Sequence, residues 1–449
     1  MIFLKKTFII SIILFLNFSL ETEAQDGFHF LKNKKKKQSL SFKLINNLIV
    51  VPLQINGKKL SFILDSGVTK TILFNITQND SIGLNNVERV ELQGLGNGKP
   101  VDALLSKKNT VSIKNIESNN ETIYVILRDY FDLSSKMGTT IHGIIGYNLL
   151  RNFVVKINYN SKKITFYNKD RFIYSKCRKC ETFPIQFHRK KPYIDAQVQL
   201  DTIGNKLTDV KLLIDSGGSD AIWLFENSKE NIKTPNRFFN DVLGEGLSGA
   251  IYGNRSRIPK IKLNSFELEK PTVSFLDSTS TKNARNFKQR NGSIGAGILK
   301  RFIVWFDYPN KKITLKKNGS FKKGFNYNMS GLDVVYNGKQ LVREKDSKKF
   351  SITNNDNVNS NSSINFITSF SYRFKPSYKI KSVLKKSPAG RAGLMKNDII
   401  LKINNIPAHN YTLGKITRLF QEKIGKRIRI IVDRNGEKMK FEFRLESKI

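Results

Sequence analysis

The sequence predicts a mainly β protein, built from two similar lobes that are followed by a smaller α+β domain. Three observations support this prediction. Most patterned segments are short runs of β-branched and aromatic residues, as in small β-barrels. The tripeptide Asp-Ser-Gly occurs at 65–67 and again at 215–217, each time after an apolar run. From Ile380 onward, by contrast, strand-like stretches alternate with a helix-like one.

The N-terminal residues 1–24 are typical of an export signal. Lys5 and Lys6 precede an apolar stretch at 8–20, and the small residue Ala24 ends the segment. This stretch is short for a bilayer span, so a cleaved signal is favoured over an uncleaved anchor. No cysteine lies near the cleavage site, which argues against a lipid anchor. We therefore expect an exported protein of the bacterial envelope, either periplasmic or secreted.

The first lobe is expected at residues 39–168. Apolar and polar residues alternate in 48–60, and Asn56-Gly57 is a turn signal typical of a β-hairpin. The strand that follows this turn ends at Asp65.

The second lobe is expected at residues 181–317 and repeats this plan. Asp215 lies 150 residues after Asp65, and Gly295 lies 149 residues after Gly146 in a second matching stretch. A slip of one residue over so long a unit indicates that the whole unit was duplicated. Two copies cannot form a solenoid, so a pseudo-symmetric pair of lobes is the better interpretation.

The two aspartates are candidates for one shared site. A carboxylate at the end of a buried strand is costly unless something uses it or pairs with it. Two such groups from related halves suggest a pair that holds a single proton. The alternative is that Asp65 and Asp215 are ordinary turn residues before glycine. The duplicated context favours the shared site.

These features resemble the retropepsin-like aspartic peptidases of bacteria that have two lobes in one chain. Each lobe of that family carries a hydrophobic-hydrophobic-Asp-Ser/Thr-Gly motif, a glycine-bearing flap, and a later hydrophobic-hydrophobic-Gly before a short helix. The resemblance covers roughly residues 40 to 320. It implies that Asp65 and Asp215 are catalytic, that a water held between them attacks peptide bonds, and that neither a metal nor another cofactor takes part.

The resemblance also implies roles for neighbouring residues. Gly67 and Gly217 allow the turns that present the carboxylates, and Ser66 and Ser216 hydrogen-bond across the lobes, unless each only forms a local turn. The flap glycines, whose alternative is ordinary hairpin turns, are Gly94, Gly96 and Gly98 in the first lobe and Gly244, Gly246 and Gly249 in the second.

Two positions depart from the pattern of pepsin-like lobes. Val68 and Gly218 stand where many such lobes have serine or threonine, so neither can donate a hydroxyl hydrogen bond to the aspartates. The charged form of the pair should then be less stabilised. Thr69 and Ser219 restore a hydroxyl one position further on.

The C-terminal region, residues 325–449, resembles a PDZ domain. The run Ser-Pro-Ala-x-x-Ala-Gly-Leu at 387–394 follows a strand-like stretch and precedes a helix-like one at 413–422. A PDZ domain binds a peptide C-terminus by adding it as a strand to a sheet edge. By analogy, Ser330, Gly331 and Leu332 belong to the carboxylate-binding loop, and the edge strand is 333–335 or, alternatively, 366–374. The polar stretch 337–363 predicts a mobile insertion.

The charge excludes little by itself. Lys and Arg total 77 against 37 Asp and Glu, a formal net charge of +40. The lysines are scattered and no nucleic-acid-binding motif is present, so non-specific contact with an anionic envelope surface is favoured over specific nucleic-acid binding.

The histidines and the cysteines give weaker evidence for a functional site. The four histidines lie far apart and have no metal-ligand spacing. Cys177 and Cys180 are too few for a structural zinc site and lack a thioredoxin-like context. A local disulfide or two free thiols remain open.

Together these patterns predict an exported aspartic endopeptidase that acts as a monomer, with a PDZ domain that binds peptide or protein C-termini. A non-catalytic peptide-binding protein of the same fold and an envelope scaffold are the alternatives. Retention of both aspartates with their glycines argues against the two alternatives.

Overall fold

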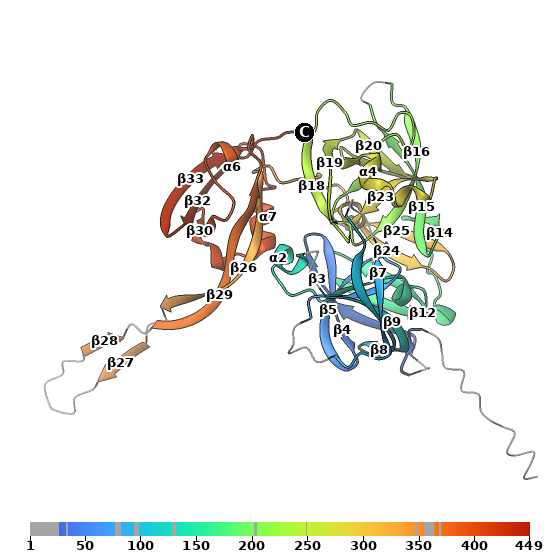
Figure 1. Ribbon diagram of the computed structural model, residues 1–449, viewed down its shortest axis with the longest axis horizontal. Coiled ribbons are helices and arrows are strands. Elements are labelled where there is room, and N and C mark those ends of the chain that lie inside the picture. Colours follow the sequence, from blue (N-terminus) through green and yellow to red (C-terminus); the bar gives the residue numbers. More distant parts are fainter. Residues whose placement is uncertain are drawn as a thin grey trace, which may run out of the picture.

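The computed structural model describes residues 27–32, 35–76, 82–93, 98–127, 132–201, 204–247, 249–345, 349–353, 363–367 and 370–449. The expected export signal at 1–24 lies outside the described residues. The protein is mostly β, with two lobes side by side and a C-terminal domain (residues 325–449) next to both of them (Figure 1). No helix within the described ranges is long and apolar enough to cross a membrane.

The first lobe is built on a nine-stranded sheet, ordered β1-β9-β6-β10-β5-β4-β8-β7, with β3 beside β4. The expected hairpin is present, because β4 and β5 pair across the turn at Asn56-Gly57. Beside it, β5 runs parallel to β10. The strands of this sheet are β1 (His29–Phe30), β3 (Lys43–Ile45), β4 (Leu48–Ile55), β5 (Lys58–Leu64), β6 (Thr71–Leu73), β7 (Val87–Leu92), β8 (Val101–Ile113), β9 (Ile116–Ile126) and β10 (Gly143–Ile145).

The second lobe repeats this arrangement in a ten-stranded sheet, ordered β18-β19-β22-β17-β23-β16-β15-β20-β21, with β14 beside β15. Here β16 runs parallel to β23, as β5 does to β10 in the first lobe. The strands are β14 (Gln186–His188), β15 (Lys191–Gln199), β16 (Leu207–Asp215), β17 (Ile222–Phe225), β18 (Phe239–Gly246), β19 (Gly249–Arg257), β20 (Lys260–Leu263), β21 (Phe266–Glu269), β22 (Thr272–Leu276) and β23 (Arg290–Gly295).

A six-stranded antiparallel sheet joins the lobes, in the order β13-β25-β24-β11-β12-β2. Its central pair is β11 and β24, in which Lys156 lies opposite Trp305. Each lobe contributes three strands, so neither lobe can complete this sheet alone. The strands are β2 (Lys37–Ser41), β11 (Phe153–Asn158), β12 (Lys163–Asn168), β13 (Cys180–Pro184), β24 (Phe302–Asp307) and β25 (Lys312–Lys317).

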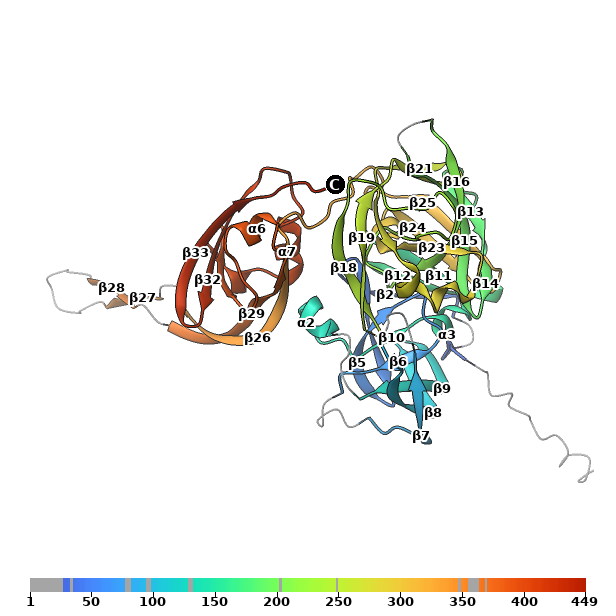
Figure 2. The same cartoon turned by 45° about the horizontal axis from the view of Figure 1, so that its top comes forward.

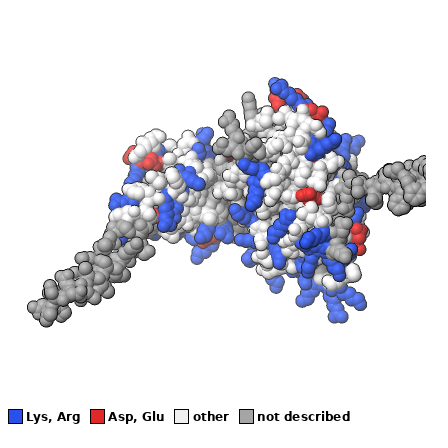
Figure 3. Space-filling view, turned by 90° about the horizontal axis from the view of Figure 1, so that it is seen from below, with Lys and Arg blue, Asp and Glu red and all other residues white. Residues whose placement is uncertain are grey.

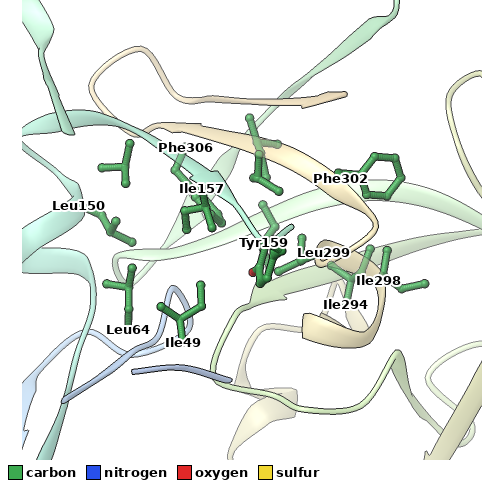
Figure 4. Packing of buried hydrophobic residues seen from close by; sticks show 14 of the residues in the cluster. Ile49, Leu64, Leu150, Ile157, Tyr159, Ile294, Ile298, Leu299, Phe302 and Phe306 are labelled. Carbon is green, nitrogen blue, oxygen red and sulfur yellow. The ribbon is translucent and has the colours of Figure 1, made fainter. Parts of the chain in front are cut away.

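One hydrophobic core runs through both lobes. Aromatic residues of the joining sheet, such as Phe306, lie in it beside residues of the strands that lead to the two Asp-Ser-Gly loops (Figure 4). The two lobes therefore share one hydrophobic core and do not form two separate domains. The labelled residues are Ile49, Leu64, Leu150, Ile157 and Tyr159 from the first lobe and Ile294, Ile298, Leu299, Phe302 and Phe306 from the second.

The helices of the lobes are single short turns. As expected from the sequence, α3 follows Gly146 and α5 follows Gly295. The helical segments are α2 (Leu133–Met137), α3 (Tyr147–Leu150), α4 (Ser278–Thr281) and α5 (Ala296–Leu299), with 3-10 turns at η1 (Lys169–Arg171) and η2 (Ala284–Asn286).

The C-terminal domain has its own core and a six-stranded sheet ordered β26-β29-β30-β32-β33, with β31 beside β30. The predicted helix and the two final strands are present. The elements are β26 (Leu332–Lys345), β29 (Phe370–Val383), β30 (Ile399–Ile403), β31 (Ile406–Pro407), β32 (Arg427–Arg434), β33 (Glu437–Arg444), α6 (Pro388–Arg391), η3 (Ala408–Asn410) and α7 (Leu413–Leu419).

The structure differs from the expected insertion at 337–363. β26 continues to Lys345 by pairing with β29, and a small hairpin of β27 (Lys349–Thr353) and β28 (Ser363–Ile367) lies within the range. The polar composition does not predict the pairing of β26 with β29, because these two strands lie far apart in the sequence. Residues 333–335 lie in β26, the edge strand in the described part of the sheet, and β29 is its neighbour.

Candidate active site

The two Asp-Ser-Gly loops face each other where the lobes meet. Asp65 follows β5, and its N–H donates to the Ile145 carbonyl of β10 at 2.9 Å. Asp215 ends β16 opposite Gly295 of β23. A parallel strand pair in each lobe thus delivers one carboxyl to the junction, and a side-chain hydrogen bond joins the two carboxyls.

Crossed hydrogen bonds between the serines hold the loops together. The backbone N–H of Ser66 donates to the Ser216 hydroxyl at 2.9 Å, and that of Ser216 donates to the Ser66 hydroxyl at 3.0 Å. Each hydroxyl then donates to the opposite lobe, from Ser66 to the Ile214 carbonyl at 2.8 Å and from Ser216 to the Leu64 carbonyl at 2.9 Å. Both serines are buried. The bonds therefore run across the lobes rather than within one turn.

Gly217 and Gly146 lie so close to atoms of Asp65 that neither position has room for a side chain. A Cβ at Gly217 would lie 2.2 Å from Asp65 Oδ2, because the second loop passes directly over the first carboxyl. A Cβ at Gly146 would lie 2.0 Å from the Asp65 carbonyl oxygen. Any side chain at either position would push the aspartate away from its partner. Gly67 is less crowded, with its nearest carboxyl oxygen at 3.2 Å.

Burial changes the acidity of the pair. Loss of water, together with the neighbouring Asp215 carboxyl, raises the pKa of Asp65 to about 7. Burial also raises the pKa of Asp215, but the positive charge of Arg290 and the N–H of Gly218 act against this rise. These two groups favour the charged form of Asp215 in a singly protonated pair.

Two buried cations beside the dyad were not anticipated from the sequence. Arg290, at the start of β23, is 4% exposed and hydrogen-bonds Tyr193, and its charge acts on Asp215. Lys191, at the start of β15, is half-buried, and its charge acts on both aspartates. A basic residue at the first position of a strand was the available signal in each case.

Positions 68 and 218 have no hydroxyl group, and backbone N–H groups donate to the two aspartates instead. The N–H of Gly67 donates to Asp65 Oδ1 at 2.7 Å, and the N–H of Gly218 donates to Asp215. Val68 packs against the apolar cluster of the first lobe.

The flap candidates form hairpins in both lobes. In the first lobe β7 and β8 pair across the loop that ends near Gly98, and Gly94 and Gly96 lie outside the described residues. In the second lobe β18 and β19 pair up to Gly246 opposite Gly249. A Cβ at Gly244 would touch the Trp223 ring at 4.0 Å, so this part of the hairpin lies over an aromatic side chain.

A charged network supports the second flap and was also missed by sequence reasoning. Arg255 of β19 bonds Asp220 at 3.0 Å and Asp241 of β18 at 2.9 Å. Asp220 also accepts from the Trp223 ring N–H at 2.8 Å and from Ser274 at 2.9 Å. Asp220 lies just before β17, which contains Trp223, but the other three residues come from β18, β19 and β22, so no local sequence pattern predicts the network.

The remaining predicted site residues lie apart from the dyad. Ser330 is buried, and its hydroxyl accepts from the N–H of Leu332 at 3.0 Å and donates to Asn328. Gly331 has a positive φ of 79°, and Leu332 begins edge strand β26. Cys177 and Cys180 form a disulfide, which decides between the two states left open.

The first lobe covers part of this strand. Helix α2 lies against β26. Gly138, which follows α2, packs against Leu413 of α7, and a Cβ added at Gly138 would lie 3.3 Å from the Leu413 Cβ. Asp132 and Lys381 form an ion pair of 2.8 Å between the lobe and the C-terminal domain. Helix α2 and Gly138 of lobe 1 therefore lie beside both β26 and α7.

Comparison with known proteins agrees with this geometry. Residues 51–149 match the family model described as aspartyl protease, and residues 379–434 match that of the PDZ domain. The chain carries an aspartyl protease domain and a PDZ domain. Among solved structures it is similar to the aspartic proteinase from Irpex lacteus, with 13% sequence identity over 64% of this chain and 99% of that chain, at a TM-score of 0.41. No curated protein matches the chain significantly.

Within the ranges described above, no three His, Cys, Asp or Glu side chains lie together in a group that could hold a metal ion. Two carboxyls that face each other at the junction of the lobes, with different groups around them, can share one proton and act as an acid and a base.

The dyad should lower the stability of the fold as the pH rises. The pKa of Asp65 is about 7 in the folded protein and about 4 in an unfolded chain. Its contribution to stability is therefore complete below about pH 4 and is lost as the pH rises through about 7. Asp65→Asn cannot ionise, so its melting temperature should exceed that of the wild type by several degrees at about pH 8 and by little at about pH 4.

Thermal unfolding followed by circular dichroism at both pH values measures this difference. Asp209→Asn, which removes an exposed carboxyl from the same strand as Asp215, is the matched control. An equal gain for both variants at the higher pH would contradict the assignment of the effect to burial.

Proposed function

We propose that this protein is an exported aspartic endopeptidase. The observation that carries the proposal is the pair of buried carboxyls, Asp65 and Asp215, brought together by two duplicated loops and joined by a hydrogen bond. Buried carboxyls that face each other cost free energy, and a fold keeps them where their chemistry is used. The match of residues 51–149 to the aspartyl protease family supports the same reading.

The unequal acidity of the pair assigns the roles. Asp215, whose charge is stabilised by Arg290 and by the N–H of Gly218, acts as the general base and takes a proton from a water bound between the carboxyls. The water oxygen forms a bond to the peptide carbonyl carbon. Asp65, which holds the shared proton, donates a hydrogen bond to the developing oxyanion.

Collapse of the tetrahedral intermediate completes the reaction. The carbon–nitrogen bond breaks, and the leaving amine receives a proton from the pair, which returns to its singly protonated state. No covalent enzyme intermediate is needed. The flap hairpins close over the substrate and limit the access of other water molecules.

The PDZ domain gives the protein a second peptide-binding element. Its edge strand β26 offers backbone hydrogen bonds to an added strand, and by analogy with PDZ domains the loop at Ser330 and Gly331, where Gly331 has a positive φ, would receive a terminal carboxylate. In this proposal the protein works as a monomer in the periplasm or outside the cell. Substrate proteins are then held by their C-termini while another segment enters the cleft.

A peptide-binding protein without catalysis is the competing function. Such a protein would need the cleft but not the ionisable pair, and asparagine at position 65 or 215 would keep the same shape without buried charge. The presence of both carboxyls favours the peptidase.

Either Asp65→Asn or Asp215→Asn should remove nearly all peptidase activity while leaving the fold intact. The reaction needs one proton shared between two carboxyls, so we expect a loss of at least about a thousandfold in kcat/KM for each variant, on the order of other disabled catalytic units. The double variant should be no worse than either single variant. Cleavage of a fluorogenic peptide library measures this, with circular dichroism as the folding control. A single variant that keeps most of the activity would rule out the shared site.

Activity should be highest at mildly acidic pH and should fall above about pH 7, because the pKa of Asp65 is about 7 and the pair loses its shared proton there. Val68→Ser should move the acid limb of the profile to lower pH, since a hydroxyl that donates to a carboxylate favours its charged form. Val68→Ala is the matched control, because it removes the same bulk without adding a donor. The measurement is kcat/KM against pH, and identical acid limbs in the two variants would contradict the hydrogen-bond argument.

Peptide binding at β26 should compete with the contact between α2 and the PDZ domain. Asp132→Asn or Lys381→Gln breaks their half-exposed ion pair, which contributes at most about 1 kcal/mol, so the affinity for a peptide with a free C-terminus should rise by up to about fivefold. Fluorescence anisotropy with a labelled peptide measures this rise. Asp102→Asn, an exposed acid on the same lobe, should leave the affinity unchanged. Weaker binding by both ion-pair variants would mean that lobe 1 helps to form the groove.

A further inference from the structure

A two-stranded arm extends from the PDZ domain. It consists of residues 339–345 of β26 and 370–375 of β29, which pair in antiparallel register with Leu341 opposite Phe374 and Arg343 opposite Tyr372. The arm points away from both lobes in two views of the molecule (Figures 1 and 2). It is therefore remote from the dyad, and it begins directly after Tyr336, Asn337 and Gly338, which line a pocket together with Ser134 and Ser135 of α2.

The outer face of the arm is apolar and aromatic. Residues that lie opposite each other in an antiparallel pair share a face, and this places four large side chains together. They are strongly exposed, with 59% for Leu341, 46% for Phe370, 65% for Tyr372 and 70% for Phe374. Soluble proteins rarely expose such a continuous row unless another surface covers it.

Cations alternate with this row on the same face. Lys339, Arg343 and Lys345 are all exposed and occupy the paired positions between the apolar residues. The Arg343 guanidinium lies 3.7 Å from the centroid of the Phe370 ring. On the described part of this face no carboxylate is present.

The other face of the arm has a different character. There Glu344 pairs with Lys375 at 3.1 Å and with Arg373 at 3.7 Å, so one carboxylate offsets part of the charge of two cations. The strict alternation of the two strands therefore gives one polar face on which an acid partly offsets the cations, and one face that combines aromatic groups with three cations and no acid.

We propose that the outer face of the arm binds the surface of an anionic lipid bilayer. Aromatic and aliphatic side chains enter the headgroup region, and the three cations contact lipid phosphates, the combination found in interfacial membrane-binding elements. Charge complementarity selects an anionic surface, because the face carries three cations and the whole chain has a net charge of +40. Lysine and arginine also spread over the lobes (Figure 3), which adds long-range attraction but does not choose the contact face.

Binding through the arm would leave the cleft free. Since the arm and the lobes lie on opposite sides of the PDZ domain (Figure 1), the aspartyl protease domain stays in the aqueous phase above the bilayer. This inference does not depend on the proposed peptidase activity, because it concerns residues that touch neither aspartate.

Co-sedimentation of the full-length protein with vesicles tests the proposal. We expect binding to phosphatidylcholine vesicles that contain about one third phosphatidylglycerol, and little binding to phosphatidylcholine alone. Raising the salt from about 0.1 M to about 0.5 M should weaken this binding strongly. Equal binding to both vesicle types, or none to either, overturns the proposal.

Paired variants locate the contact. Arg343→Gln with Lys345→Gln removes two charges from the outer face, and Arg373→Gln with Lys375→Gln removes two from the opposite face. The first pair should weaken vesicle binding by about tenfold or more and the second by less than about threefold. Equal losses would show that net charge, rather than this face, drives binding, and would overturn the proposal.

Insertion of the aromatic row is measured separately. Tyr372→Trp should shift its emission to shorter wavelength with anionic vesicles, and Phe374→Ser should weaken binding where Val342→Ser, on the opposite face, does not. If light scattering instead shows a dimer that Phe374→Ser abolishes, a second copy covers the face. If RNA binds the outer face and displaces vesicles at equal charge concentration, the face binds nucleic acid. Either result overturns the lipid assignment.

Discussion

The crossed hydrogen bonds between Ser66 and Ser216 are the constraint on which the arrangement of the two aspartates depends. They tie the two loops at 2.9 and 3.0 Å, so the carboxyls that precede them must face each other. The six-stranded sheet and the common core hold the lobes close enough for these bonds to form. Because each serine also bonds a carbonyl of the opposite lobe, a change in the docking of the lobes would leave buried polar groups without partners.

The buried dyad has an electrostatic cost that the surrounding residues reduce unequally. Arg290 and the N–H of Gly218 favour the charge on Asp215, whereas burial and the neighbouring Asp215 carboxyl raise the pKa of Asp65 to about 7. Backbone donors replace the hydroxyls that pepsin-like lobes often place at positions 68 and 218. The asymmetry between acid and base therefore arises from second-lobe residues, although the two loops are copies of each other.

The PDZ domain packs directly against both lobes. Its Tyr327 ring lies 5.6 Å from that of Phe239 on the second flap strand, and Arg237 donates to the Lys448 carbonyl. On the other side, α2 of the first lobe lies against β26. The second flap strand and β26 thus both take part in the docking of the PDZ domain, whereas the arm extends away from the lobes.

The sequence by itself determined the elements and the duplication. Alternation, the Asn56-Gly57 turn and the repeated Asp-Ser-Gly motif are local signals, so they predicted the hairpins, the two lobes and the pairing of Asp65 with Asp215 that the structure brings together. The tertiary structure decided which distant side chains meet: Arg290 beside the dyad, α2 against β26, and the network around Arg255. It also extended β26 into a stretch that composition marked as an insertion. Such contacts join residues far apart in the chain, and their free energy comes from burial and charge pairing that exist only once the chain has folded.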